Sequence, residues 1–125
     1  MKKIIRTDKA PAPIGPYSQA ILSGNTLYVS GQIAINPADG QLITINIIRE
    51  ANQVMENIGA ILKEAGFDYN DIIKTTIYLK DMQNFQAVNE VYGNYFKENF
   101  PARETVEVSG LPKNVNLEIA VIAGK

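Results

Sequence analysis

Two hydrophobic periods run along this chain, and they predict where its helices and strands lie. Over residues 47–65 the apolar side chains recur every three or four positions, which is typical of an amphipathic helix, and Gly66 ends the pattern. A second stripe of this kind covers residues 85–96, and either Asp81 or Asn84 can cap the helix that it predicts.

The remaining apolar positions alternate with polar ones, which indicates strands. The predicted strands are Lys3–Arg6, Ala20–Ser23, Thr26–Ile33, Ile72–Leu79, Glu104–Val108 and Asn116–Ala123. Residues 68–71 are expected to form a loop. Because there is no linker or repeat, we expect residues 1–125 to form one α+β domain of two layers.

This order of elements predicts a single mixed β-sheet with two α-helices on one face. The opposite sheet face still carries many apolar side chains. Such a face needs a partner, so the sequence alone predicts an oligomer.

The composition then excludes several kinds of chemistry. The chain has no histidine and no cysteine, which removes disulfides, thiolate nucleophiles, serine–histidine pairs and the usual metal ligands. No Asp/Glu cluster suggests a metal site. The formal net charge of −1 gives no basic excess for nucleic acid. The first residues lack the apolar core of a signal peptide, and no apolar run approaches membrane-spanning length, so we expect neither. We expect a soluble cytoplasmic protein.

Arg103, one of only three arginines, is the strongest candidate functional residue. Strand alternation places Arg103 and Thr105 on one face. A hairpin turning near Pro112 would bring Glu118, on the next strand, close to them. An arginine fork suits a small carboxylate, and a glutamate can handle a water molecule. The same spacing also fits a structural ion pair at a sheet edge or subunit contact.

Four further residues are candidates for a binding site, each with a structural alternative. Tyr17 follows a rigid loop and either borders a pocket or packs its ring on the core. Gly31, inside a strand, allows a ligand to approach or marks a β-bulge. Ser30 lacks a histidine to activate it and can serve only as a hydrogen-bond donor. Asn89, in the second helix, is kept for a hydrogen bond or is simply exposed.

Seven short motifs run in order over essentially the whole chain. They are Gly15-Pro16-Tyr17-Ser18-Gln19-Ala20, Ser30-Gly31-Gln32-Ile33, Asn36-Pro37, Pro101-Ala102-Arg103, Val106-Glu107-Val108, Leu111-Pro112-Lys113 and Glu118-Ile119. Each is weak alone, but together they resemble the YjgF/YER057c/UK114 family, whose reactive-intermediate deaminases are called RidA.

The resemblance implies a chorismate-mutase-like α+β fold and a homotrimer with clefts between subunits. It also implies hydrolysis of 2-imino acids, such as 2-iminobutyrate and 2-iminopropanoate, to 2-oxo acids and ammonia without a cofactor. By position, Arg103 matches the arginine that grips the substrate carboxylate, and Glu118 matches the glutamate that orients the attacking water. Tyr17, Ser30 and Gly31 match cleft residues.

The chain departs from the family pattern at three places. Thr105 stands where many members have cysteine, which matters little if the backbone amide makes the contact. Ala120 replaces a second glutamate. Residues 45–48, Ile-Asn-Ile-Ile, replace the usual Gly-Asp-Ile-acidic start of the first helix.

Two other functions fit the same resemblance. An endoribonuclease activity is also attributed to family members, but the chain lacks the histidines and the positive charge that phosphodiester cleavage usually uses. A non-catalytic trimer that binds 2-oxo acids, or a regulatory or chaperone-like surface, would keep the arginine and show no turnover.

Overall fold

The computed structural model describes residues 1–125. Its strands and α-helices are, in chain order, β1 (Lys2–Ile5), β2 (Ala20–Ser23), β3 (Thr26–Gln32), α1 (Ile47–Glu64), β4 (Ile72–Leu79), α2 (Phe85–Gly93), β5 (Ala102–Glu107) and β6 (Leu117–Gly124). Three single 3₁₀ turns accompany them, η1 (Tyr69–Asp71), η2 (Met82–Asn84) and η3 (Pro112–Asn114).

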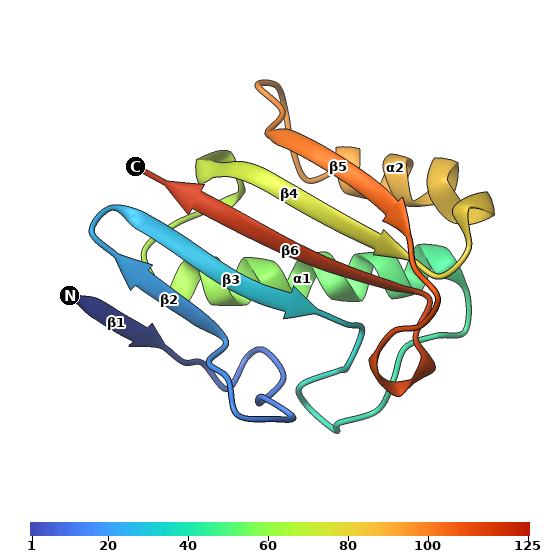
Figure 1. The fold of residues 1–125 in the computed structure, drawn as a ribbon, viewed down its shortest axis with the longest axis horizontal. Helices are drawn as coiled ribbons and strands as arrows, with labels where there is room; N and C mark the ends of the chain where they lie inside the picture. Colours follow the sequence, from blue (N-terminus) through green and yellow to red (C-terminus); the bar gives the residue numbers. More distant parts are fainter.

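The six strands form one mixed sheet in the order β1-β2-β3-β6-β4-β5 (Figure 1). All neighbours are antiparallel except β4 and β5, which are parallel. A parallel pair needs a long crossover, and the segment containing α2 provides it. The last strand of the chain, β6, therefore lies in the middle of the sheet, between β3 and β4.

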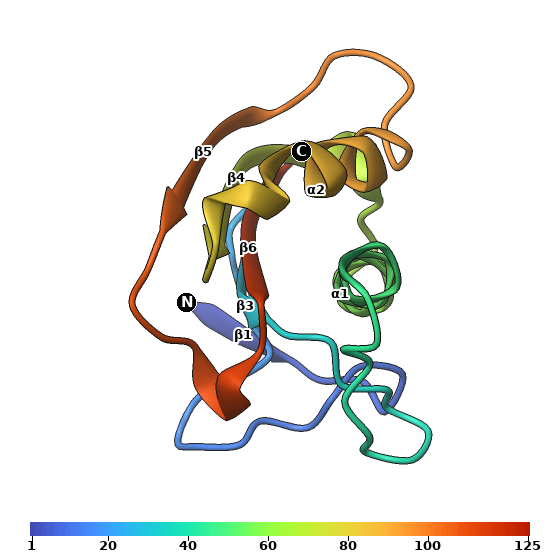
Figure 2. The same ribbon diagram turned by 90° about the vertical axis from the view of Figure 1, so that its right-hand side faces the viewer.

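Both helices cover the same face of this sheet, so the predicted two-layer α+β architecture is confirmed (Figure 2). The core lies between the helices and the sheet, because alternate residues of each central strand point towards the helices. The fully buried apolar side chains of α1 and of β6 meet there; they are Val54, Met55, Ile58, Ile61, Leu62, Leu117, Ile119 and Ala123.

Helix α1 begins and ends close to the predicted residues. The Asn46 side chain caps its first turn by accepting a hydrogen bond from the Arg49 amide at 2.9 Å. Gly66, at φ 83°, provides the left-handed conformation that follows the helix.

Helix α2 is shorter than predicted, and neither proposed residue caps it. Asn84 makes no side-chain cap, whereas Asp81 caps the preceding turn η2 by accepting from the Gln83 amide. The α-helix stops at Gly93 because the next amides donate to the carbonyl three residues back instead of four, as in Phe96 N to Gly93 O at 3.2 Å.

Residues 68–71, where the sequence predicts a loop, contain the 3₁₀ turn η1, capped by Asp68.

The predicted hairpin between the last two strands is wrong. β5 pairs only with β4, and β6 pairs with β3 and β4, so β4 separates the two strands. The connection 108–116 instead carries the chain across β4, and the Lys80 amide donates to Asn116 O at 3.0 Å where β6 is about to begin.

The face opposite the helices is uncovered and partly apolar, as the sequence predicts. Ile4, Tyr28 and Val106 on this open face are 62%, 50% and 42% exposed. One ion pair, Lys74–Glu104 at 3.2 Å, lies among them.

Neither α-helix combines the length and the apolar composition that crossing a membrane requires.

Candidate functional site

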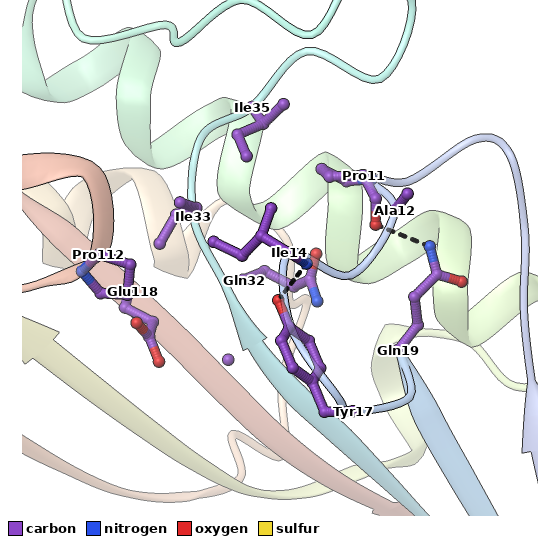
Figure 3. A pocket seen from close by; sticks show the side chains of 11 residues that line it. Pro11, Ala12, Ile14, Tyr17, Gln19, Gln32, Ile33, Ile35, Pro112 and Glu118 are labelled. Atoms are coloured by element: carbon purple, nitrogen blue, oxygen red, sulfur yellow. Dashed lines mark hydrogen bonds between the residues drawn. The ribbon is translucent and has the colours of Figure 1, made fainter.

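Two separate hollows contain most of the residues singled out from the sequence. The first, here called the Glu118 hollow, encloses about 40 Å³ and is lined by residues that include Tyr17, Gly31, Pro112 and Glu118. Figure 3 shows Ile14 and Tyr17 on one side of it, and Pro112 and Glu118 on the other. The second, the Arg103 hollow, encloses about 280 Å³ beneath α2.

In the Glu118 hollow, strand alternation on β6 sends Leu117 and Ile119 into the core and Glu118 to the open face. The Glu118 carboxylate lies against Gly31, so closely that a Cβ on Gly31 would collide with it. Burial raises the pKa of Glu118 above its ordinary value of 4.5. A half-buried carboxylate of this kind is a better proton acceptor than an exposed one.

Tyr17 stands at the mouth of this hollow, and its surrounding loop is rigidly held. The Ile14 amide donates to the Tyr17 hydroxyl at 3.2 Å, which leaves that hydroxyl free to donate elsewhere. The buried Gln19 side chain accepts from the Thr7 amide and donates to the carbonyls of Thr7 and Pro11 (Figure 3). Tyr17 is 46% exposed, so the alternative of a ring packed in the core does not hold.

Ser30 and Gly31 form a β-bulge in β3, at a register shift between Val29 and Gln32. Ser30 Oγ donates to Ser18 O at 2.6 Å, and the Ser30 amide donates to Gln19 O at 2.9 Å. The Ser30 hydroxyl therefore ties the loop to the strand, and only its oxygen lone pairs remain for a ligand.

The Arg103 hollow is lined by Asn89, Tyr92, Gly93, Phe100, Pro101 and Arg103. The Arg103 guanidinium carbon lies 5.1 Å from the centre of the Tyr92 ring and 5.8 Å from that of Phe85. It forms no ion pair, so its N–H fork is available for an anion. Asn89 and Arg103, which the sequence placed on different elements, thus share one hollow.

Thr105 lies two residues further along β5, on the same face as Arg103. Its hydroxyl oxygen is buried and has no hydrogen-bond partner. A buried polar atom without a partner is unusual, and one beside a free arginine fits the edge of a binding site.

The two hollows lie on opposite faces of the sheet. Arg103 is in register with Thr75, which is fully buried under the helices. Glu118 is in register with Tyr78 on the open face, one strand away from β5. Arg103 and Glu118 therefore cannot meet within one chain, and both the predicted single-chain site and the Arg103–Glu118 ion pair are excluded for the monomer.

Sequence reasoning missed three buried polar residues that hold the Glu118 hollow in shape, namely Gln19, Glu50 and Asn57. Glu50 and Asn57 occupy the apolar face of α1, seven residues apart. The helical period assigns both positions to the core, where a polar residue is unusual. This is the signal in the sequence that would have identified Glu50 and Asn57.

Residues 7–125 match the family described as Endoribonuclease L-PSP, and the chain belongs to this family, also called the YjgF/RidA family. A RutC family protein of Pyrococcus horikoshii is 55% identical over 125 residues, which are 100% of this chain and 99% of the relative. The human 2-iminobutanoate/2-iminopropanoate deaminase is 48% identical over 98% of this chain and 90% of its own length.

The fold is also that of solved structures. E. coli TdcF, whose structure contains bound serine, has a TM-score of 0.95 and 40% identity, with 98% of each chain covered. The predicted family and fold class are thereby confirmed.

Proposed function

We propose that this protein hydrolyses reactive 2-imino acids and their enamine forms, such as 2-iminobutyrate and 2-iminopropanoate, to 2-oxo acids and ammonia. One observation carries the proposal: an arginine without a counter-ion and a glutamate of raised pKa each line a hollow. These two groups are what a small imino acid requires, one for its carboxylate and one for water. The names of relatives such as the human protein support the same reaction.

The active site that we propose is shared between subunits, because the two hollows face opposite sides of the sheet. In a homotrimer, the Arg103 hollow of one subunit would lie against the Glu118 hollow of the next. Two features support this arrangement. The open face carries exposed apolar side chains that need cover, and β5, which carries Arg103, is an edge strand.

In this site the substrate carboxylate pairs with the Arg103 fork through two parallel hydrogen bonds. The Phe85 and Tyr92 rings hold the guanidinium in place, which orients the fork before the substrate arrives. Asn89 lines the same hollow as the bound carboxylate, and Thr105, whose buried hydroxyl has no partner, lies two residues beyond Arg103 on the same face of β5.

Glu118 of the neighbouring subunit then handles the water. The water oxygen attacks the carbon of the protonated imine while Glu118 accepts one of the water protons, which gives a neutral carbinolamine. Glu118 returns that proton to the nitrogen. The C–N bond then breaks as the carbinolamine hydroxyl gives its proton to Glu118 and the C=O bond forms, and the products are the 2-oxo acid and ammonia, which takes up this last proton. Tyr17 and Gly31 lie beside the reacting carbon. The hydroxyl oxygen of Ser30 faces the loop that carries Tyr17.

Imines hydrolyse readily in water, so positioning and partial desolvation are enough to accelerate the reaction. The chemistry needs no nucleophilic side chain and no cofactor. This accounts for a site built without histidine or cysteine.

Substitution of Arg103 tests the proposal. 2-Iminobutyrate, generated freshly by a pyridoxal-phosphate lyase, is supplied to the wild type and to Arg103→Ala, and ammonia release is followed. Loss of a charged hydrogen-bond pair costs about 3 kcal/mol, so kcat/KM should fall by about 100-fold. Arg49→Ala, which removes an exposed arginine outside both hollows, is the matched control. An Arg103→Ala protein as fast as the wild type would exclude the mechanism.

Bound serine in E. coli TdcF favours a second candidate, a trimer that binds small carboxylic acids without turning them over. The same assay separates the two. A binding protein would retain 2-oxo acids through Arg103 and leave the rate of ammonia release at its uncatalysed value.

A further inference from the structure

Glu50, in the first turn of α1, is a carboxylate that the proposed reaction does not use. It is completely buried and forms no ion pair. Instead, both of its oxygens accept hydrogen bonds from a single residue. Oε2 accepts from the Asn116 amide at 2.8 Å, and Oε1 accepts from Asn116 Nδ2 at 2.7 Å.

Stability alone does not explain a carboxylate at this position. Removing a carboxylate from water is costly, and an apolar residue of similar size would fill the same core position without that cost. Only the N-terminus of α1 and the two Asn116 donors compensate it. What Glu50 achieves, and a leucine would not, is to fix the main chain at Asn116.

Asn116 is the point where the chain enters β6. Its carbonyl accepts from the Lys80 amide at 3.0 Å, at the end of β4, so all three of its polar groups are held. Glu118 follows two residues later and has no hydrogen bond to orient its own carboxylate. Its position therefore depends on the strand, which pairs with Tyr78 of β4 at this residue and is held at its start through Asn116, and on contact with Gly31.

Asn57 does the same for another part of the lining of the Glu118 hollow, the chain from Ile33 to Ile35. Its Nδ2 donates to Ile33 O at 3.1 Å and to Ile35 O at 3.0 Å, and the side chains of both isoleucines line the hollow. Gln53 Nε2 fixes the Asn57 amide by donating to Oδ1 at 2.9 Å. Glu50 and Asn57 lie seven residues apart, on one face of α1. One helix thus holds two separate segments that border the hollow.

We propose that Glu50 is a positioning residue for the water-handling Glu118, acting through Asn116, and that Asn57 positions the part of the lining formed by Ile33 and Ile35. Only the kinetic part of this inference, the expected change in the rate of ammonia release, rests on the proposed function. The structural part, that Glu50 immobilises residues 112–118, holds or fails without any substrate.

The test compares Glu50→Ala, Glu50→Gln and a control, Tyr69→Phe. Glutamine has the same shape as glutamate. If the side-chain amide of Asn116 rotates by 180°, the glutamine of Glu50→Gln can accept a hydrogen bond from the Asn116 main-chain N–H and donate one to Asn116 Oδ1. Tyr69→Phe removes another hydrogen bond to α1, from the Tyr69 hydroxyl to Met55 O at 2.8 Å, and Tyr69 lines neither hollow. Amide hydrogen exchange of residues 113–118 and steady-state ammonia release are measured for each protein.

For Glu50→Ala we expect amide exchange in residues 113–118 to become at least about 10-fold faster and kcat to fall by about 10-fold or more. KM should stay within about twofold of the wild-type value because Arg103 is untouched. Glu50→Gln should restore both. Tyr69→Phe should change neither. Where Glu50→Ala does not fold, Asn116→Ala, which removes one of the two bonds, is judged by the same criteria.

Two results would overturn the inference. Unchanged exchange in Glu50→Ala would show that Glu50 does not hold the segment. Faster exchange with an unchanged kcat would show that the contact does not position Glu118. A wild type without deaminase activity would refute the proposed function instead, and the exchange measurement would still decide whether Glu50 immobilises the segment.

Discussion

At Gly31 the absent side chain leaves the space that the Glu118 carboxylate occupies. Gly31 does not have a positive φ, so the requirement for glycine comes from this contact and not from a left-handed backbone. The two residues lie 87 positions apart in sequence, and only the pairing of β3 with β6 brings them together.

We expect Gly31→Ala to keep the fold and lose activity. The new methyl group would displace the Glu118 side chain, which is half-exposed and can turn towards solvent, so kcat should fall by about 10-fold or more. Gly110→Ala is the control, because a Cβ there meets nothing within 4 Å. Kinetics and thermal unfolding measure the two effects, and full activity in Gly31→Ala would show that the contact is not needed.

The pKa of Glu118 predicts a pH dependence. Burial raises this pKa above 4.5, so the carboxylate takes up a proton at a higher pH than an exposed glutamate does. Because the proposed reaction needs the ionised form, kcat/KM should fall as the pH drops through the raised pKa, with an inflection above 4.5. Glu118→Gln should show a low, flat profile, and a wild-type rate constant that stays flat down to pH 4.5 would contradict the assignment.

At the scale of elements, α2 is joined to the sheet beside Arg103 by one buried hydrogen bond. The Tyr92 hydroxyl donates to Thr75 Oγ1 at 2.9 Å, and Thr75 is fully buried. Burial raises the pKa of Tyr92, so the hydroxyl stays protonated and keeps donating. This bond places the Tyr92 ring against the guanidinium.

We expect Thr75→Val to lower the free energy of unfolding by about 1–2 kcal/mol, because it leaves the Tyr92 hydroxyl without its partner. The double variant Thr75→Val/Tyr92→Phe should be less destabilised than the sum of the two single variants, since both partners are then apolar. Urea unfolding of the four proteins measures this. Strictly additive changes would mean that the bond contributes nothing of its own.

The sequence predicts the elements well and their pairing less well. The strong periods of α1 and β4 identify them, but β5 has no apolar face. Arg103, Thr105 and Glu107 alternate with Ala102, Glu104 and Val106, so nothing in the sequence tells which set lies under the helices. The placement of β5 beyond β4 depends on the parallel crossover through α2, a tertiary feature. The sequence therefore proposes the candidate residues, and the resemblance proposes roles for them, whereas their distribution over two hollows required the structure.

At the scale of the whole molecule, a site shared between subunits can be tested by mixing. Arg103→Ala and Glu118→Gln are each expected to be nearly inactive alone. Trimers can be assembled from equal amounts of the two variants. In each cleft, the subunit that supplies Arg103 has it intact with probability about one half, and the same holds for the subunit that supplies Glu118, so about a quarter of the clefts would have both residues intact.

Co-expressed, differently tagged subunits should therefore recover about a quarter of the wild-type activity. Proteins purified separately and mixed without exchange of subunits serve as the control and should stay inactive. If the mixed trimers are as inactive as their parents, both residues act within one subunit or in an assembly of another kind.

The central place of β6 has a consequence for how the chain folds during synthesis. β1, β2 and β3 can pair as they emerge, and so can β4 and β5, but these two groups have no contact in the sheet until β6 is made. A ribosome-bound chain ending before Leu117 therefore exposes two unpaired inner edges, which are surfaces prone to aggregation. The same strand that delivers Glu118 to the proposed active site completes the sheet, so the protein acquires its fold and its function in one late step.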